Sequence, residues 1–270
     1  GSKGSGYHPE PTYSSQTDLM SWGPKMDGTL YYQYYNEKAG IGGSYDQLGD
    51  FRRTATPFIS YGDWFKDYFE TGHSWTNSLS VEGRINNRNS IRVSVRDTHS
   101  DGIIPNSPSN MQHLSLRTRN EIAKWFTSEV SLNYRRDHSD NKPVSSGYSA
   151  GAGIMYSLWC YAPNIDMDWA KHYWQDGKEG LNQDTSLSGT KNNAYFIANE
   201  SLNTQNRDRI YGNVKFDFKI YKGLTLMVRG GLDSQYDFRT QRFAFSTPKD
   251  PNGFYREQTI RSIQFSGEFL

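Results

Sequence analysis

The feature that most constrains this sequence is a strict alternation of apolar and polar residues over five separate stretches. In the clearest stretch, residues 210–220, apolar side chains and one glycine occupy every second position, and the positions between them include Lys215, Asp217 and Lys219. Because successive side chains of a β-strand point to opposite faces, this pattern predicts a sheet with one uncharged face and one charged face. A strand of about ten residues or more is long enough to cross a bilayer at a tilt.

Two sets of residues follow from this alternation. The apolar set is predicted to face lipid: Ile91, Val93, Leu114, Leu116, Val130, Leu132, Val214, Phe216, Phe218, Leu226 and Val228. The charged set is predicted to face the lumen of a barrel: Arg92, Arg96, Arg117, Arg119, Lys215, Asp217, Arg229 and Asp233. A polar wall of this kind suits a hydrated substrate, but its charges can equally pair across neighbouring strands or with a plug inside the barrel.

Short and long connections alternate along the chain. The short ones are tight turns at 85–90, 124–126 and 221–223. They alternate with long connections at 100–110, 138–203 and 239–255. Outer-membrane barrels have short periplasmic turns and longer extracellular loops. We therefore expect an all-β chain that is part of a large antiparallel transmembrane β-barrel with long extracellular loops.

The composition agrees with a barrel better than with a helical membrane protein. The mean hydropathy is −0.83, and no run approaches the roughly eighteen apolar residues that a transmembrane helix needs. A barrel tolerates this polarity because only every second strand residue faces lipid. The 30 basic residues are interleaved with 29 acidic ones, which argues against a nucleic-acid partner. The single cysteine, Cys160, excludes an intramolecular disulfide and a cysteine-based metal site.

The strand count predicts an incomplete barrel. About seven strands can be assigned, the first over 76–84 and the last over 263–269, and seven cannot close around a lumen lined by charged residues. The chain is therefore expected to be a piece of a longer protein. We predict extracellular loop segments over 1–75, two strand hairpins over 76–138, a long extracellular loop with a short helix (148–161) over 139–203, and further strands over 204–270. The opening Gly-Ser-Lys-Gly-Ser-Gly is either an expression remnant or native loop.

Six segments carry a resemblance to a known family. In chain order they include Ser21-Trp22-Gly23-Pro24-Lys25-Met26-Asp27-Gly28, Asp63-Trp64-Phe65 with Asn77-Ser78-Leu79-Ser80-Val81, Gly102-Ile103-Ile104-Pro105-Asn106-Ser107, Asn133-Tyr134 with Asn141-Lys142-Pro143, Ala194-Tyr195-Phe196, and Arg207-Asp208-Arg209-Ile210-Tyr211-Gly212-Asn213. Together they resemble the SusC/RagA family of TonB-dependent outer-membrane transporters, from about Ser21 to Asp237. One departure is Ala194, where members of the family often carry proline.

The resemblance implies a barrel of about 22 strands plugged by an N-terminal domain. It also implies active import of glycan or peptide oligomers, powered by the TonB complex, with a SusD-like surface lipoprotein as a lid. The location would be the outer membrane of a Gram-negative bacterium of the Bacteroidetes type, with the loops facing the exterior. The plug would precede Gly1 and the remaining strands would follow Leu270. No cofactor is implied.

Aromatic residues of the predicted loops are candidates for contact with a ligand or with the lid. Aromatic faces stack on sugar rings and give peptides rigid contact area. The candidates are Trp22, Trp64, Trp75, Trp159 and Tyr195. The alternative for each of them is packing of the loops against one another or against the lid protein.

The sequence does not favour an enzyme. Residues 147–151 fit the Gly-x-Ser-x-Gly pattern of a catalytic serine, but loop residues precede them where that motif needs a buried strand. The histidines show no zinc-binding spacing, and no acidic pair occupies an apolar setting that would suit acid catalysis. We therefore expect no catalytic residue and no metal site.

Two other functions share part of this pattern. A passive porin or an adhesin-type barrel would have the same strands without a plug or a lid. A soluble carbohydrate-active β-protein, such as a glycoside hydrolase, would use its aromatic residues to line a cleft and would be released into buffer without detergent.

Overall fold

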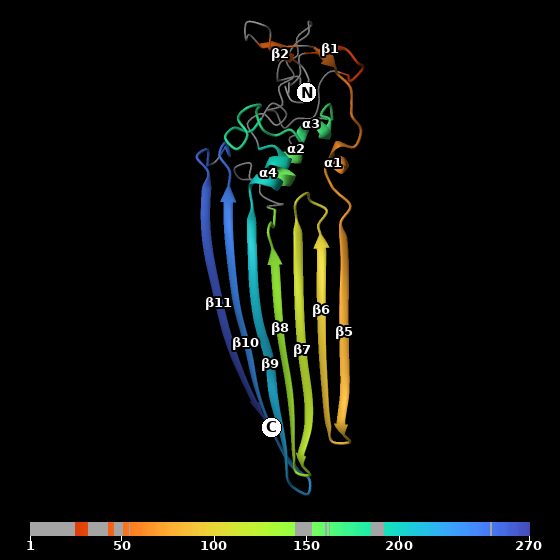
Figure 1. Ribbon diagram of the computed structural model, residues 1–270, viewed down its shortest axis with the longest axis vertical. Coiled ribbons are helices and arrows are strands. Elements are labelled where there is room, and N and C mark those ends of the chain that lie inside the picture. Colours follow the sequence, from red (N-terminus) through yellow and green to blue (C-terminus); the bar gives the residue numbers. More distant parts are fainter. Residues whose placement is uncertain are drawn as a thin grey trace.

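The computed structural model describes residues 25–31, 43–45, 51–53, 55–143, 153–159, 161, 163–184, 192–248 and 250–270. These residues form one long antiparallel sheet and a small helical cap that lies over one end of it (Figure 1).

The sheet is a meander of seven strands, each paired with its neighbours in sequence. The strands are β5 (His73–Asn86), β6 (Asn89–Asp101), β7 (Pro108–Ala123), β8 (Phe126–Ser139), β9 (Asn203–Tyr221), β10 (Leu224–Phe243) and β11 (Phe254–Phe269). Strands β5 and β11 are its two edges, so the sheet is open. The predicted all-β fold is confirmed, although the strands are longer than the alternation alone indicated, with 19 residues in β9 and 20 in β10.

Shorter elements make up the rest of the described chain. The helices are α1 (Trp64–Asp67), α2 (Ile154–Trp159), α3 (Met167–Ala170) and α4 (Ala194–Glu200). Two small pairs join β1 (Leu30–Tyr31) to β4 (Thr56–Pro57), and β2 (Gly43–Tyr45) to β3 (Phe51–Arg53). Helix α2 lies within the short helix predicted for the long loop, whereas α1, α3 and α4 are too short to show a periodicity. None of the helices in the described part of the chain has the length and apolarity to cross a membrane.

The pairing is irregular beside each of the three tight turns. At the last turn Leu224 pairs with Tyr221, but Thr225 pairs with Lys219, so one residue is skipped. A shift of one residue exchanges the faces of a strand, and here it brings apolar positions of adjacent strands to the same side. The skipped residue is an isoleucine at all three turns: Ile85, Ile122 and Ile220.

The register places all eleven residues predicted to face lipid on one face of the sheet. Leu116, for example, lies between Val93 and Leu132, and Phe216 pairs with Val228. The eight residues predicted to face the lumen lie on the opposite face. No second layer of the described residues covers the apolar face, where Phe216, Leu226 and Val228 are 36–37% exposed. Coverage of this face by lipid stays a prediction.

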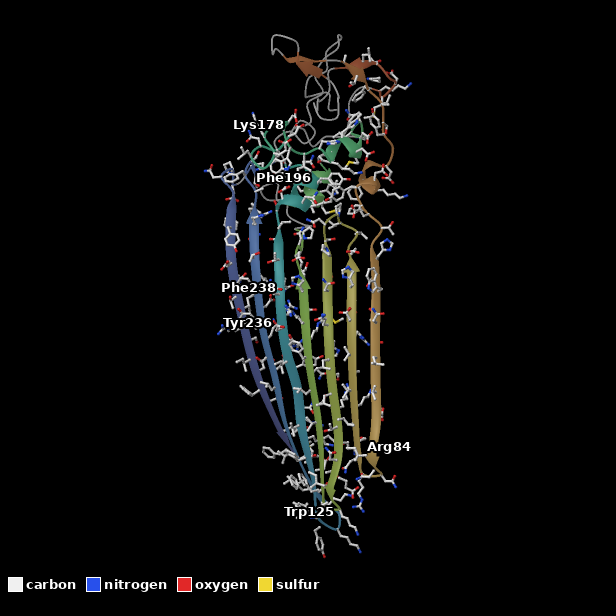
Figure 2. All side chains as sticks on the ribbon, in the orientation of Figure 1. Arg84, Trp125, Lys178, Phe196, Tyr236 and Phe238 are labelled. Atoms are coloured by element: carbon white, nitrogen blue, oxygen red, sulfur yellow. The ribbon has the colours of Figure 1, made fainter. Side chains whose placement is uncertain are left out.

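The dimensions of the apolar face match those of a bilayer. From Ile210 to Ile220 the face extends about 33 Å along β9, at about 3.3 Å per residue, and a tilt of about 40° reduces this to about 25 Å. Aromatic side chains lie at both ends of the sheet's apolar face, with Trp125 in the turn between β7 and β8 and Tyr236 toward the cap (Figure 2). These are the positions of aromatic girdles in membrane barrels.

Strands β9 and β10 continue past this apolar band toward the cap (Figure 1). In this extension both faces of β9 are polar, with Asn206 and Asp208 on one side and Gln205 and Arg207 on the other. The residues 203–209 add about 20 Å of strand at the same rise per residue.

The hydrophobic core of the molecule lies in the cap. None of the buried hydrophobic residues in the described ranges belongs to β5–β11. The main cluster is formed by Tyr68, Ile154, Leu158, Tyr161, Ile165, Met167, Ala170, Ala194, Tyr195, Ile197 and Ala198. The sheet is therefore held by its backbone ladder, and the cap by packing.

Candidate functional site

The cap is built from short helices that begin at side-chain caps. Asp63 accepts a hydrogen bond from the Lys66 amide at the start of α1, and Asp166 accepts one from the Asp168 amide at the start of α3. Asn193 accepts from the Tyr195 amide at 2.8 Å at the start of α4. Such caps satisfy amide groups that the first helical turn leaves unpaired.

Aromatic packing joins the segment before β5 to the long loop between β8 and β9. The Tyr68 hydroxyl donates to the Ala194 carbonyl at 3.2 Å, and its ring centroid lies 4.8 Å from that of Tyr195. Phe196 is fully buried, with its centroid 5.2 Å from that of Trp174. Residues from two distant parts of the sequence thus form one packed body.

Two asparagines join this packed body to the adjacent end of the sheet by hydrogen bonds. The Asn141 amide group donates to the carbonyls of Asn106 and Ala198, each at 2.8 Å, and its oxygen accepts from the Asn203 amide at 3.1 Å. Asn106, in the β6–β7 connection, also donates to the Ala198 carbonyl at 3.0 Å. Three connections therefore meet at the end of α4. Asn106 and Asn141 both belong to the family-like segments of the sequence.

The charged face of the sheet is largely paired with itself. Arg119 and Glu129 lie 3.0 Å apart on adjacent strands, and Arg229 and Glu268 lie 3.1 Å apart. Lys215 lies 2.9 Å from Asp217 on its own strand. Asp233 is paired with Arg209. Arg92 donates to Ser80 at 3.0 Å, and Arg96 and Arg117 lie on the same face. The alternative of pairing between neighbouring strands therefore accounts for several of the residues predicted to face the lumen.

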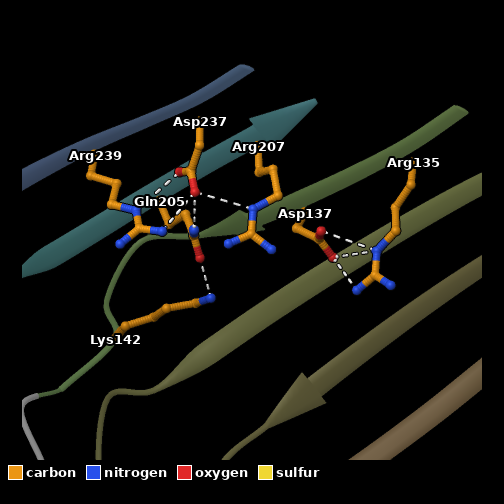
Figure 3. A network of polar contacts seen from close by, with 7 residues as sticks. All are labelled: Arg135, Asp137, Lys142, Gln205, Arg207, Asp237 and Arg239. Carbon is orange, nitrogen blue, oxygen red and sulfur yellow. Dashed lines mark hydrogen bonds and ion pairs between the residues drawn. The ribbon is translucent and has the colours of Figure 1, made fainter. Parts of the chain in front are cut away.

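A denser polar network lies on this face near the cap (Figure 3). The side chain of Asp237 is fully buried and accepts hydrogen bonds from Gln205 at 2.8 Å, Arg207 at 3.1 Å and Arg239 at 2.7 Å. A buried carboxylate requires such partners, because its burial without them would be costly. Beside it, Asp137 is held by the guanidinium of Arg135 at 2.8 Å.

The network forms one wall of a pocket of about 570 Å³. Its lining includes Lys142, Arg207, Arg239 and Arg256, together with polar residues of β9, β10 and β11. Lys142 lies just after β8 and donates to Gln205. Burial lowers the pKa of the Lys142 ammonium, and the positive charge of Arg207 lowers that pKa further.

A second pocket, of about 480 Å³, lies between the long loop and the β10–β11 connection. Aromatic side chains dominate its lining: Trp174, Phe243, Phe245, Phe254 and Tyr255. Glu200 and Arg242 add one charge of each sign. None of these residues was among the predicted contacts, since they come from three segments that only the fold brings together.

The five predicted aromatic contacts do not form one site. Trp22 lies outside the described residues, and Trp64 begins α1 with a side chain that is not described. Trp159 is 62% exposed at the end of α2. Trp75 is 55% exposed on β5, where its ring centroid lies 4.8 Å from that of His99 on the apolar face.

Tyr195 differs from the other four because its side chain is buried in the cap core. It is 6% exposed and packs against Tyr68, so the packing alternative describes this residue. Burial raises the pKa of its hydroxyl to about 12. We therefore treat Tyr195 as a core residue of the cap.

No group of three or more histidine, cysteine, aspartate or glutamate side chains suited to a metal ion occurs within the described ranges.

Comparison with known proteins supports the fold. No protein-family model matches the sequence, and no curated protein matches it. Among solved structures, the chain is similar to the RagAB peptide importer in a closed-closed state, with a TM-score of 0.59 and 19% identity over 78% of this chain and 23% of that one. It is also similar to the open-open state, with a TM-score of 0.58 and 18% identity over 76% of this chain and 22% of that one. A further structure of the RagAB peptide transporter has a TM-score of 0.56 and 21% identity over 77% of this chain and 23% of that one.

The chain thus spans less than a quarter of the solved chains that it resembles. Over that part it has the fold of the corresponding segment of the RagAB chains, an antiparallel meander of long strands. This agrees with the resemblance read from the six sequence segments. The similar structures are described as a peptide importer or a peptide transporter.

Proposed function

We propose that this chain forms part of the wall and outer loops of an outer-membrane importer of oligomers. The observation that carries the proposal is a single-layer sheet whose apolar face has the height of a bilayer and whose other face is charged. Such a sheet has no core of its own, so its apolar face needs a cover, and hydrocarbon supplies one without a second protein layer.

Peptides are the oligomers that we favour over glycans. The three similar structures are peptide importers or transporters, and this supports the choice for the present chain. TonB-powered import and a SusD-like lipoprotein lid are proposed from the resemblance of the sequence to the SusC/RagA family. The packed cap offers a firm surface on which such a lid could rest. The location would be the outer membrane of a Bacteroidetes-type Gram-negative bacterium, with the cap facing the exterior.

Membrane extraction and uptake test the proposal. In cells expressing the full-length protein, we expect it to stay in the membrane fraction after carbonate washing and to enter solution with detergent. We also expect uptake of a fluorescent peptide that stops when the proton-motive force is collapsed. Release into buffer without detergent would favour the soluble β-protein, and uptake that continues without the proton-motive force would favour the passive porin.

A further inference from the structure

The pocket between Lys142 and strand β11 has an unbalanced charge. Four cationic side chains line it, from Lys142, Arg207, Arg239 and Arg256, and no acidic residue does. Behind the lining, Asp237 supplies one negative charge. Four cations against one carboxylate leave a surplus of three positive charges at this place.

Neighbouring acidic groups do not cancel this surplus. Asp137 is held by Arg135, so that pair is neutral. Asp208 and Glu257 lie on the opposite face of the sheet, as the register shows, where Asp208 accepts from the hydroxyl of Tyr134 and Glu257 from that of Tyr255 at 2.7 Å. The excess of positive charge therefore stays on the face that carries the pocket.

The cations also retain unused donors. A guanidinium has five N–H groups and an ammonium has three. Arg207 uses its Nε for Asp237, and Arg256 donates to the Gln258 side chain at 3.3 Å. The Lys142 ammonium donates to Gln205. Within the described part of the chain, these three side chains make no other hydrogen bond or ion pair. Several charged donors thus face a space of about 570 Å³ that can hold a small group.

We infer that this pocket binds the terminal carboxylate of an imported peptide. Arginine forks match the two oxygens of a carboxylate, and such charge-assisted hydrogen bonds are stronger than neutral ones. Every linear peptide has this group whatever its sequence, so the pocket would hold peptides without selecting their side chains. The inference rests on the proposed function, because it assumes that peptides reach this face.

The same charges give the peptide a direction. A surplus of positive charge repels the amino terminus and attracts the carboxyl terminus. The carboxyl end would lie against β9, β10 and β11, and the rest of the peptide would extend along the polar wall or toward the aromatic pocket lined by Trp174 and Tyr255.

The decisive test compares two forms of one probe. A heptapeptide of Ala, Ser and Leu, labelled at its amino end, is made as a free acid and as a carboxyl-terminal amide. Its binding to the full-length protein in detergent is measured by fluorescence anisotropy. We expect the free acid to bind roughly tenfold more tightly than the amide, as the loss of a charge-assisted contact predicts.

Variants locate the effect in the pocket. Arg256→Gln and Lys142→Gln each remove a cation that does not hold Asp237, so neither leaves a buried carboxylate unpaired. Each variant should bind the free-acid peptide several-fold more weakly and leave the affinity for the amide unchanged. Lys178→Gln is the matched control, because it removes the same charge from an exposed position of the cap outside the pocket (Figure 2).

The outcomes separate this inference from the proposed function. Equal binding of the free acid and the amide would overturn the carboxylate pocket and leave peptide import standing. Binding of neither form would overturn peptide import as well. Binding of an oligosaccharide of uronic acids with no binding of either peptide would keep an anion pocket but overturn its assignment to peptides.

Discussion

The sheet and the cap place their apolar side chains in opposite surroundings. In the sheet, Phe216 and Val228 are partly exposed on an open face, and the buried positions are mostly polar. In the cap, Ile154, Leu158 and Phe196 are fully buried. Both regions are part of the same chain and meet at the ends of the strands.

The difference is the one that the proposed membrane location predicts for the two regions. A region surrounded by water gathers its apolar side chains inside, as the cap does. A region surrounded by hydrocarbon gains nothing from that arrangement and must instead pair every backbone group, as a closed barrel of such strands does. In the proposed membrane location, the boundary between hydrocarbon and water would lie where β9 becomes polar on both faces, between Ile210 and Asp208.

The largest expected effect is on the cap. Phe196→Ala should lower the stability of the cap by about 3–5 kcal/mol, because it leaves a cavity among fully buried side chains. Hydrogen exchange of the α4 amides, measured by mass spectrometry on the protein in detergent, should accelerate while exchange in β6–β9 stays slow. The matched control is Leu181→Ala, which changes a 61% exposed residue of the same cap and should have little effect. Equal loss of protection in the sheet would show that the two regions unfold together.

A change of the opposite kind tests the apolar face. Phe216→Arg should oppose insertion by about 2–4 kcal/mol, because it places a charge against hydrocarbon near the midplane. Lys215→Ala, one residue away on the other face, removes two partly exposed ion pairs of the polar wall, with Asp217 and with Glu129, and should lower the stability by less than about 1 kcal/mol. The fraction of folded protein in the outer membrane, read from the gel shift between unheated and boiled samples, compares the two. Equal tolerance of both variants would contradict the assignment of the faces.

A third prediction concerns the close approach of strands in the sheet. A Cβ atom added at Gly212 would collide with the carbonyl oxygen of Ser131 on the adjacent strand, and backbone atoms cannot easily move aside. Gly212→Ala should therefore lower the free energy of unfolding by about 1–3 kcal/mol, as overpacking does. A Cβ atom added at Gly230 has no neighbour within 4 Å, so Gly230→Ala should leave the stability nearly unchanged. Denaturant midpoints in lipid vesicles would measure both, and a mild Gly212→Ala would mean that β8 and β9 can separate there.

The smallest effect is a titration in the cap. The pKa of Tyr195 is raised to about 12 from the ordinary value of 10.0, because burial disfavours the phenolate. The neutral form is therefore favoured in the folded state, and this contribution to stability is lost as the pH rises from about 10 to about 12. The ultraviolet difference between the wild type and Tyr195→Phe should show one tyrosine that ionises at a higher pH than an exposed tyrosine does. Ionisation near pH 10 would indicate a cap that is open to water.

The sheet could be predicted from the sequence because its pattern is local. In residues 210–220 the polarity of each side chain indicates which face of the strand it occupies. The faces can therefore be assigned without knowledge of the partner strands or the loops. The tight turns then predict which strands pair. The one-residue shifts beside these turns could also be inferred, because a regular two-residue turn would pair Phe216 with Arg229 and set an apolar face against a charged one.

The cap and the polar network could not be predicted from a local sequence pattern. Helices α1 and α3 have four residues each, too few for a periodicity. The cluster around Asp237 depends on the pairing of β9 with β10, which sets Asp237 opposite Arg207. The alternation marked Arg207 and Asp237 only as charged positions. The sequence could not separate exposed Trp159 from buried Tyr195, because both lie in similar loop settings.

The polar extension of β9 and β10 has a consequence for where capture takes place. The headgroup layer on each side of a bilayer adds only about 5–8 Å to the hydrocarbon, whereas the extension is about 20 Å long. At the tilt of about 40° the extension rises about 15 Å along the membrane normal, so in the proposed location the outer part of the basic pocket, at Lys142 and Asn203, would stand above the headgroups. Attraction at that height would be screened by the salt of the surrounding medium, over a distance of about 8 Å at physiological ionic strength.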